Sequence, residues 1–526
     1  MIYPVKRLHL ERYSDTINIA SLILRGVIMT LFLIGLVILF VGGYFYANLC
    51  EKQIEPDDRE TPAIAKADGM DFVGMSKNKN FLIELLNIAG TGPVLGPIQG
   101  ILFGPIAFIA IPIGNIIGGS AHDYFNGMIS MRNGGAQIPK LVSKYLGNNT
   151  RKFYNVVIGI LLLLTGVVFV YTPGDLIAKD VLGKDPSGSI IWIIYACIFL
   201  YYIVATLFPI DAIIGKIYPL FGAFLIISAV GIFFGIITQG SGHLAFEGQG
   251  LLAQHPGGQK FIPAFFVTVA CGILSGFHGS QSTLISRTVR HEKEGKFVFY
   301  WAMVMEGFIA MCWAGGAMVL FSNGTAPLDT GATAMVGEVS RAFMGNIGGM
   351  LAVVGVIVLP ITSGDTAFRA LRLIIADELG IEQRSWAKRI SISLAIFIPA
   401  FGILYFAKSS PGGFNLLWRY FGFTNQFVAL FALGVATVYL YVNGKKWIMP
   451  LIPGIFYTFI VFSYISHMKI GLGLEERFLS KWNPAIDPMS YTGSYVVGAV
   501  LAILYVVFVL KHAKNNTEKI LETKLD

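Results

Sequence analysis

Two interrupted apolar stretches decide the fold, and they read Gly90-Thr91-Gly92-Pro93-Val94-Leu95-Gly96-Pro97 and Ser275-Gly276-Phe277-His278-Gly279-Ser280-Gln281-Ser282. Each lies inside a segment that is otherwise apolar enough to cross a bilayer. In a helix interior glycine costs about 1 kcal/mol and proline about 3 kcal/mol relative to alanine, and proline also removes a backbone donor. Because lipid cannot hydrogen-bond the freed backbone groups, such breaks must lie against protein or a water-filled cavity.

The composition indicates an integral membrane protein. Of the 526 residues, 55% are hydrophobic and 13% are charged, whereas soluble domains carry about 25% charged residues. The net charge of +8 would suit nucleic acid in a soluble protein, but the basic residues lie in short loops between apolar segments, where membrane topology explains them. We therefore expect the lipid bilayer, and no nucleic acid, as a partner. The four cysteines include no CxxC pair, which argues against a disulfide or zinc framework.

A membrane-spanning helix needs about 20 predominantly apolar residues. By this criterion the sequence predicts an all-α integral membrane protein with about thirteen transmembrane helices. They are expected near residues 24–47, 81–103, 105–130, 153–173, 189–209, 212–238, 262–286, 297–321, 347–375, 390–407, 414–442, 447–467 and 492–511. The first is too long for the apolar region of a signal peptide, so we interpret it as a retained helix.

The two breaks lie five spans apart, in the second and seventh predicted helices. An odd offset places the two helices in opposite senses across the bilayer, which is typical of inverted-repeat transporters with discontinuous helices at the binding site. The pattern thus predicts a LeuT-like core of five plus five helices. The alternative is that both stretches are glycine-rich faces for close helix packing.

This interpretation divides the chain into four parts. Residues 1–80 hold an additional membrane helix and a cytoplasmic loop, 81–238 the first five-helix repeat, 239–442 the second repeat with an external loop, and 443–526 two C-terminal membrane helices and a short cytoplasmic tail. Counting from the N-terminal tail, the even-numbered loops carry about 12 positive charges and the odd-numbered loops about 25, and positive loops stay in the cytoplasm. We expect the C-terminus in the cytoplasm and the N-terminus outside.

Polar side chains inside the predicted spans are candidate ion-coupling residues, because charges at this depth are costly and usually functional. Thr362, Ser363 and Asp365 follow one another in segment 347–375, where two hydroxyls can complete a sodium site and a carboxylate can carry a proton. The alternative for Asp365 is a local pair with Arg369, one helical turn later. Glu306, in segment 297–321, is either a proton relay or a hydrogen-bonded core residue.

Two histidines fall in informative places. His278 lies inside the second break and can hold a carboxylate or pass a proton near neutral pH, or serve as a structural residue. His122 and Asp123 are expected on the inner half of their span, where Asp123 and Arg132 are a candidate inner gate. Plain anchoring at the membrane interface is the alternative for that group, and Glu84 is also expected to be interfacial.

The ends of the broken helices are the candidate substrate site, because exposed N–H groups at a helix N-terminus attract a carboxylate. The candidate residues are Gly90, Thr91, Gly92, Gly96, Gly276, Phe277, His278, Gly279, Ser280 and Gln281. Catalytic signatures are missing from the sequence: His291-Glu292-Lys293-Glu294-Gly295 lacks the second histidine of a zinc-protease motif, and neither a GxSxG elbow nor a phosphate-binding loop occurs. We therefore expect no enzyme, no cofactor and no metal beyond a sodium ion at Thr362 and Ser363.

Several of these segments resemble the carbon starvation protein A (CstA) family. The resemblance is carried by Thr61-Pro62-Ala63, Asp68-Gly69-Met70-Asp71-Phe72-Val73, Ile88–Pro97, Ala121-His122-Asp123-Tyr124-Phe125, Ser130-Met131-Arg132-Asn133-Gly134-Gly135, Ser275–His278 and Thr362–Thr366. It covers the whole hydrophobic chain and implies a plasma-membrane transporter linked to starvation, on a fold related to the amino acid–polyamine–organocation superfamily. Family members are associated with peptide uptake and with pyruvate uptake by proton symport. Many of them carry a His-His pair where this sequence reads Ile83-Glu84, so proton coupling and substrate choice do not carry over safely at that point.

The sequence as a whole predicts secondary active uptake of a short peptide or pyruvate together with a cation. The residues do not choose between peptide and pyruvate, or between proton and sodium. A passive channel or a membrane nutrient sensor without coupled transport is the alternative, and a membrane-embedded enzyme is disfavoured by the missing catalytic motifs.

Overall fold

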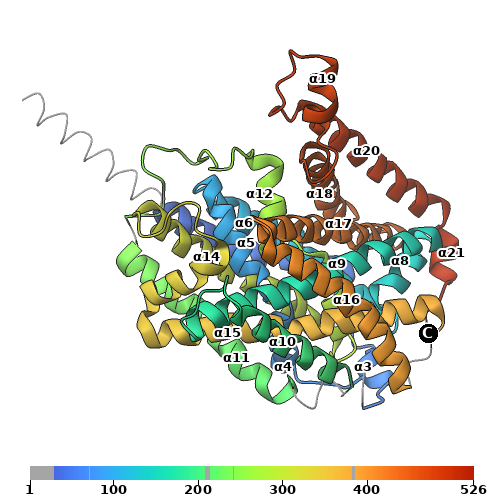
Figure 1. Ribbon diagram of the computed structural model, residues 1–526. Coiled ribbons are helices and arrows are strands. Elements are labelled where there is room, and N and C mark those ends of the chain that lie inside the picture. The colour runs from blue at the N-terminus through green and yellow to red at the C-terminus, as the bar shows by residue number, and fades with distance from the viewer. Residues whose placement is uncertain (1–28, 70–71, 208–213, 241, 382–384, 526) are drawn as a thin grey trace, which may run out of the picture.

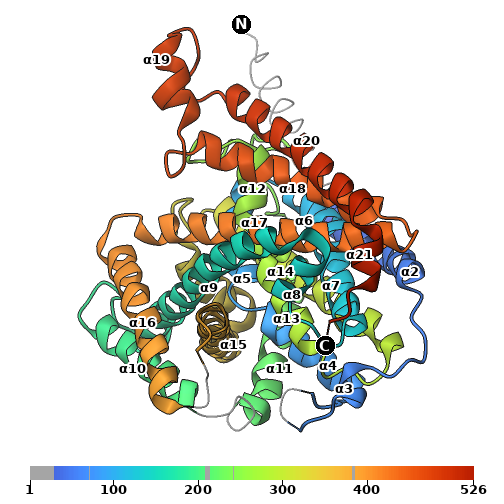
Figure 2. The same cartoon turned by 90° about the vertical axis from the view of Figure 1, so that its right-hand side faces the viewer.

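The computed structural model describes residues 29–69, 72–207, 214–240, 242–381 and 385–525, which form an all-helical bundle (Figures 1 and 2). Parts of the predictions lie outside these residues: the start of span 24–47, residues 208–209 and 212–213 at the ends of two other spans, and Met70-Asp71 of the family resemblance.

The first half of the bundle contains α2 (Gly43–Ile54), α3 (Pro62–Ala65), α4 (Lys77–Ile88), α5 (Gly92–Gly100), α6 (Ala107–Gly114), α7 (Ala121–Arg132), α8 (Ile138–Leu146), α9 (Asn148–Leu176), α10 (Ile190–Leu207) and α11 (Ile214–Gly235). The second half contains α12 (Phe261–Val269), α13 (Gly276–Ile285), α14 (Trp301–Ser322), α15 (Ala332–Leu379), α16 (Trp386–Ser409), α17 (Gly413–Val442), α18 (Ile448–His467), α19 (Ser480–Trp482), α20 (Thr492–Asn515) and α21 (Thr517–Glu522). Short π- and 3₁₀-helical segments extend or join several of them, among them η3 (Asn115–Ser120), η7 (Ala270–Gly272), η8 (Glu292–Glu294) and η9 (Lys296–Tyr300).

Ten helices of the described chain are long and apolar enough to span a membrane, or eleven when the bent pair α4 and α5 counts as one span. The prediction of an all-helical membrane protein is confirmed, but the predicted number of about thirteen is higher than this count. Segment 105–130 does form a continuous helix through α6, η3 and α7, yet its second half carries polar side chains such as His122, Asp123 and Asn126. Segment 189–209 yields only a shorter apolar helix, Ile190–Ala205.

Both predicted breaks exist, but each lies earlier in the chain than its glycine-rich motif suggested. The first separates α4 from α5 at residues 89–91 and bends the pair by 50°. The second runs from η7 to Ser275, so Gly276–Ser282 is helical. For the first break the shift has a simple cause, because proline is well tolerated in the first turn of a helix, and Pro93 occupies that position in α5.

Helix α15 runs through the middle of the bundle, packed between α9 and α11, and is seen nearly end-on in Figure 2. Helix α15 is kinked at Gly345, whose φ of 66° is in the left-handed region that favours glycine. Helices α18 and α20 lie side by side at one edge of the bundle in both views, against α17. The two broken spans meet in the interior: α5 packs on α12 and η7, and α4 packs on α13.

Three glycines spaced four residues apart explain how closely α5 approaches the second broken span. A methyl group on Gly92 would overlap Cys271, one on Gly96 would overlap the backbone carbonyl of Val269, and one on Gly100 would overlap the Val269 side chain. Small residues at this spacing let membrane helices come into backbone contact. Gly92 and Gly96 therefore serve helix packing, which was the alternative to substrate binding in the sequence analysis.

The variant Gly96→Ala should destabilise the protein by about 1–3 kcal/mol, because the added methyl group meets a backbone carbonyl that cannot move aside. Gly402→Ala is the matched control, since this exposed glycine of α16 has open space around its Cα. Thermal unfolding in detergent should show a lower Tm for Gly96→Ala and an unchanged or higher Tm for Gly402→Ala. Equal Tm values for the two variants would contradict the close packing of α5.

Candidate functional site

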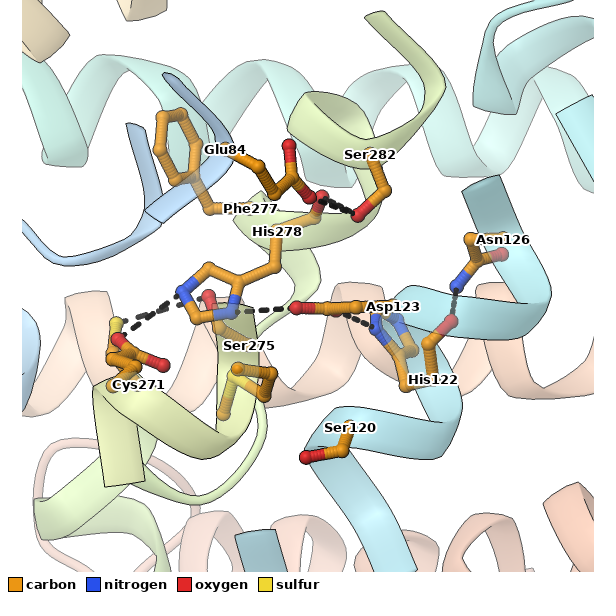
Figure 3. A network of polar contacts seen from close by, with 12 residues as sticks. Glu84, Ser120, His122, Asp123, Asn126, Cys271, Ser275, Phe277, His278 and Ser282 are labelled. Carbon is orange, nitrogen blue, oxygen red and sulfur yellow. Dashed lines mark hydrogen bonds and ion pairs between the residues drawn. The ribbon is translucent and has the colours of Figure 1, made fainter. Parts of the chain in front are cut away.

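Four titratable side chains meet in the dry interior beside the second break. His122 and Asp123 come from α7, His278 from the first turn of α13, and Glu306 from α14. We call these four residues the central cluster, and all of their side chains are 0% exposed. Figure 3 shows the ring of His278 turned toward Asp123, with His122 on the other side of that carboxylate.

The distances within the central cluster make His278 its middle member. His278 Nδ1 lies 3.3 Å from Asp123 Oδ2, and His278 Nε2 lies 3.6 Å from Glu306 Oε1. Asp123 Oδ1 is also 2.7 Å from His122 Nδ1. One imidazole therefore stands between two carboxyl groups that belong to different helices.

The central cluster leaves several of its polar atoms without a hydrogen bond. These atoms are His122 Nε2, Asp123 Oδ2, both ring nitrogens of His278 and both carboxyl oxygens of Glu306. Buried polar groups usually have hydrogen-bond partners, so this unsatisfied set makes the central cluster the candidate functional site. In the part of the chain that the structure describes, no group of three or more His, Cys, Asp and Glu side chains is arranged to hold a metal ion.

Local backbone features bring the members of the central cluster together. The π-helical segment η3 immediately precedes α7, and π-bulges inside helices are frequent at functional sites. Its Asn115 donates from Nδ2 to the carbonyl oxygens of Met303, at 2.9 Å, and of Gly272 in the second break, at 3.2 Å. Ala270, at the start of that break, has a φ of 43°, which is strained for a residue with a side chain.

Asn425 of α17 holds the other side of the second break. Its Oδ1 accepts hydrogen bonds from the Ser275 hydroxyl and from the backbone N–H of Phe277, both at 3.0 Å. This amide thus occupies part of the first turn of α13, which the sequence had suggested as a carboxylate site. Gly276 also packs against the α17 backbone, and Gly279 lies against the ring of His122.

The other predicted substrate residues are buried at or near the two breaks. Gly90 lies against the ring of Phe169, and the hydroxyl of Thr91 is buried without a hydrogen bond. Phe277 meets the edge of the Phe169 ring, with centroids 6.4 Å apart. Gln281 is buried with a free side-chain oxygen, whereas Ser280 is partly exposed.

The predicted coupling residues of α15 make their polar contacts within their own helix and none with the central cluster among the described residues. Asp365 Oδ2 is 3.2 Å from Arg369 Nη2, which is the local pairing considered as the alternative. The Thr362 hydroxyl donates to the carbonyl of Leu359 in its own helix at 2.9 Å. The hydroxyl of Ser363 is buried and has no hydrogen-bond partner.

Arg132 does not pair with Asp123 as the candidate inner gate required, and its carboxylate partner is Glu292. Arg132 Nε donates to Glu292 Oε1 at 2.6 Å, and Nη2 donates to Glu292 Oε2 at 3.1 Å. The reason is distance along α7, because nine residues at 1.5 Å per residue separate Asp123 from Arg132 by about 13 Å. Glu292 is only 1% exposed and also accepts from the backbone N–H of Asp57 at 2.9 Å.

Glu84 was expected at the membrane interface, and this expectation is wrong. Its side chain is 0% exposed, on the face of α4 that packs against α13. The Ser282 hydroxyl donates to Glu84 Oε1 at 2.7 Å. Sequence reasoning also missed Asn115 and Asn425, although a pair of amides in the apolar segment 414–442, Asn425-Gln426, was a usable signal.

The variant Asn425→Leu should lower the free energy of unfolding by about 1–3 kcal/mol, because it leaves the buried N–H of Phe277 without an acceptor. Thr437→Val on the same helix is the control, since that buried hydroxyl bonds only to the carbonyl of Leu433 in its own helix. Thermal unfolding of purified protein measures both variants. A Tm for Asn425→Leu equal to that of Thr437→Val would show that the break does not depend on this amide.

Comparison with known proteins agrees with this architecture. A protein-family model described as carbon starvation protein CstA matches residues 27–198, 154–343 and 314–463. An uncharacterized membrane protein of Haemophilus influenzae is 40% identical over 353 residues, which are 58% of this chain and 95% of that protein. A protein of Mycobacterium tuberculosis named peptide transporter CstA is 27% identical over 555 residues and covers 79% of this chain, with 71% of its own length matched. The Escherichia coli protein of the same name is 23% identical over 604 residues, with coverages of 88% and 84%.

Among solved structures, the manganese transporter of Eremococcus coleocola superposes with a TM-score of 0.55 at 14% sequence identity. The match covers 86% of this chain and 99% of that one. At this identity the likeness shows the fold alone. The chain belongs to the CstA family, as its sequence motifs predicted, and it is a multi-pass membrane transporter of that family rather than an enzyme.

Proposed function

We propose that this member of the CstA family takes up short peptides or pyruvate together with protons under carbon starvation, and that the central cluster carries the coupling proton. The observation that carries the proposal is the position of His278 between Asp123 and Glu306. An imidazole gains and loses a proton near neutral pH, and each of its two nitrogens here points to a carboxyl group.

Charge balance supports proton coupling at this place. With both carboxyls ionised and both imidazoles neutral, the central cluster would hold two negative charges in a dry interior, where each unpaired charge costs several kcal/mol. No described lysine or arginine forms an ion pair with Asp123 or Glu306. Each proton bound by an imidazole cancels one carboxylate charge, so the number of bound protons sets the net charge of the site.

The substrate carboxylate would bind at the hydroxyl of Thr91 beside the first break, and not at Gly92, which packs against Cys271. No side chain caps α5, and the hydroxyl of Thr91 beside it is buried and free to donate. The start of α13 suits a carboxylate less well, because Asn425 already accepts from the N–H of Phe277.

This proposal includes the LeuT-like division of the core. Residues 81–238 and 239–442 would be two inverted five-helix repeats, each with its broken helix first, with one further membrane helix before them and two after them. The five-span offset of the breaks supports it, as does the shared fold with the manganese transporter. Loop charge supports a plasma-membrane orientation with the C-terminus inside and the N-terminus outside.

Uptake into proteoliposomes of labelled pyruvate and of a labelled dipeptide tests the function, with proton and sodium gradients imposed separately. We expect accumulation with the proton gradient, and we expect His278→Gln to reduce it by about 100-fold or more, because glutamine cannot carry the proton. His291→Gln, an exposed histidine in a loop, is the control and should keep wild-type uptake. Equilibration without accumulation would indicate a passive channel, and sodium-driven accumulation would contradict proton coupling.

The second candidate coupling site is Asp365 with Thr362 and Ser363, where the unpartnered hydroxyl of Ser363 favours a sodium ion. The ion pair between Asp365 and Arg369 allows this site to be tested separately. Asp365→Asn alone should lower stability by about 3 kcal/mol, because it removes the carboxylate partner of a mostly buried guanidinium. The double variant Asp365→Asn/Arg369→Gln should regain stability and proton-driven uptake. A folded double variant that cannot accumulate substrate would assign the coupling ion to Asp365.

A further inference from the structure

We propose that Glu84 is the group through which the coupling proton leaves the central cluster toward the cytoplasmic side. This inference rests on the proposed proton coupling and assigns a new residue to it. Glu84 lies where the inner halves of the two broken spans, α4 and α13, pack together. We call this contact the inner seam and define it by two polar pairs, Glu84–Ser282 and Asn80–Thr288.

The two pairs follow one another along the inner seam. Asn80 Nδ2 donates to the carbonyl of Thr288 at 3.0 Å, and the Thr288 hydroxyl donates to Asn80 Oδ1 at 2.7 Å. Asn80 and Glu84 are four residues apart and share one face of α4, about 6 Å apart along its axis. The pair Asn80–Thr288 lies toward the loops 55–76 and 286–296, which carry the positive charges expected in the cytoplasm.

On its deep side the inner seam leads to the central cluster. Ser282 follows His278 by one helical turn, and its hydroxyl, which donates to Glu84 at 2.7 Å, also lies 3.0 Å from the His278 carbonyl oxygen. Figure 3 shows Glu84 and Ser282 above the ring of His278, with Asp123 beside that ring. Among the described residues of the two seam pairs, Glu84 is the titratable one. It is thus placed between the proton site and the inner surface.

The surroundings of Glu84 suit a carboxyl group that alternates between bound and released proton. Its Oε2 is buried without a hydrogen bond, and no described cation forms an ion pair with it. The charge of Asp123 acts on Glu84, and His278 and Glu306 lie on α13 and α14, which pack against α4. Helix α15 also contacts α4 and carries Asp365 and Arg369, which pair with each other. Lys296 on η9, which also packs against α4, is bound to Glu51.

The inner seam also gives the release step a physical cause. In this structure the Asn80–Thr288 pair is buried and hydrogen-bonded, one helical turn before Glu84 on α4. When the inner ends of α4 and α13 part, water reaches Glu84, and a glutamate in water has an ordinary pKa of about 4.3, so it gives up its proton at neutral pH. The proton taken from the central cluster would then leave on the cytoplasmic side.

A purely structural role is the competing explanation, and the variant Glu84→Gln separates the two. The glutamine side chain still accepts the hydrogen bond from Ser282 but cannot carry a proton. Glu51→Gln is the matched control, because this glutamate pairs with Lys296 outside the inner seam. Both variants and the wild type are reconstituted into proteoliposomes and tested with labelled pyruvate and a labelled dipeptide.

Two transport modes are compared. Net uptake driven by a proton gradient requires proton release inside, whereas exchange of labelled for unlabelled substrate at equal pH can proceed with the proton bound throughout. We expect Glu84→Gln to lose net uptake by at least about tenfold and to keep exchange within about twofold of wild type, while Glu51→Gln keeps both.

Three results would overturn the inference. Net uptake by Glu84→Gln equal to that of wild type would show that Glu84 does not carry the proton. Equal loss of net uptake and exchange in a folded variant would show that Glu84 has a structural role only. A wild type without proton-driven uptake would refute the proposed coupling itself, and Glu84 with it, so this failure is distinguishable from the other two.

Discussion

Burying His278 between two carboxyl groups, at 3.3 Å from Asp123 and 3.6 Å from Glu306, requires three helices to meet at one dry point. An apolar bundle tolerates such a cluster only when its charges are balanced. The backbone around the central cluster is irregular because α13 has to begin where His278 can reach both carboxyl groups. The strained Ala270 and the amides of Asn115 and Asn425 hold that start in place.

The two broken spans are joined in different ways on either side of the cluster. Between α5 and α12, glycines 92, 96 and 100 allow backbone contact, and a methyl group at any of them would overlap its neighbour. Close-packed contacts of this kind are not continuously deformable. Between α4 and α13, the contact instead includes the hydrogen-bonded polar pairs of the inner seam. Water can replace those hydrogen bonds at little net cost, which supports the proposed separation of the spans at the inner seam.

The sequence alone predicts a feature of the structure only when that feature depends on residues close together in the chain. The breaks, His278 and Glu306 could be located because glycine, proline and charge inside an apolar segment are visible without any neighbour. The partner of Arg132 could not, since Glu292 lies 160 residues away and only the fold brings it close. Glu84 shows the same limit. Its position near the start of the predicted span suggested the membrane interface, but in the structure α13 covers its side chain. Gly92 and Gly96 fit either packing or binding from sequence alone, and only the position of α12 decides between them.

The departure of this chain from its family's motif gains a physical meaning from the same geometry. The family resemblance sets Ile83 and Glu84 against a His-His pair, and in the structure Glu84 accepts a hydrogen bond from Ser282 in the inner seam. Histidine and glutamate can both bind and release a proton, but they do so over different pH ranges. A carboxyl group in water keeps its proton only at acidic pH, so its release at neutral pH depends on access of water more than on the pH of the cytoplasm. In the proposed proton path, this exchange of residue would alter what controls proton release while keeping a titratable group at that position.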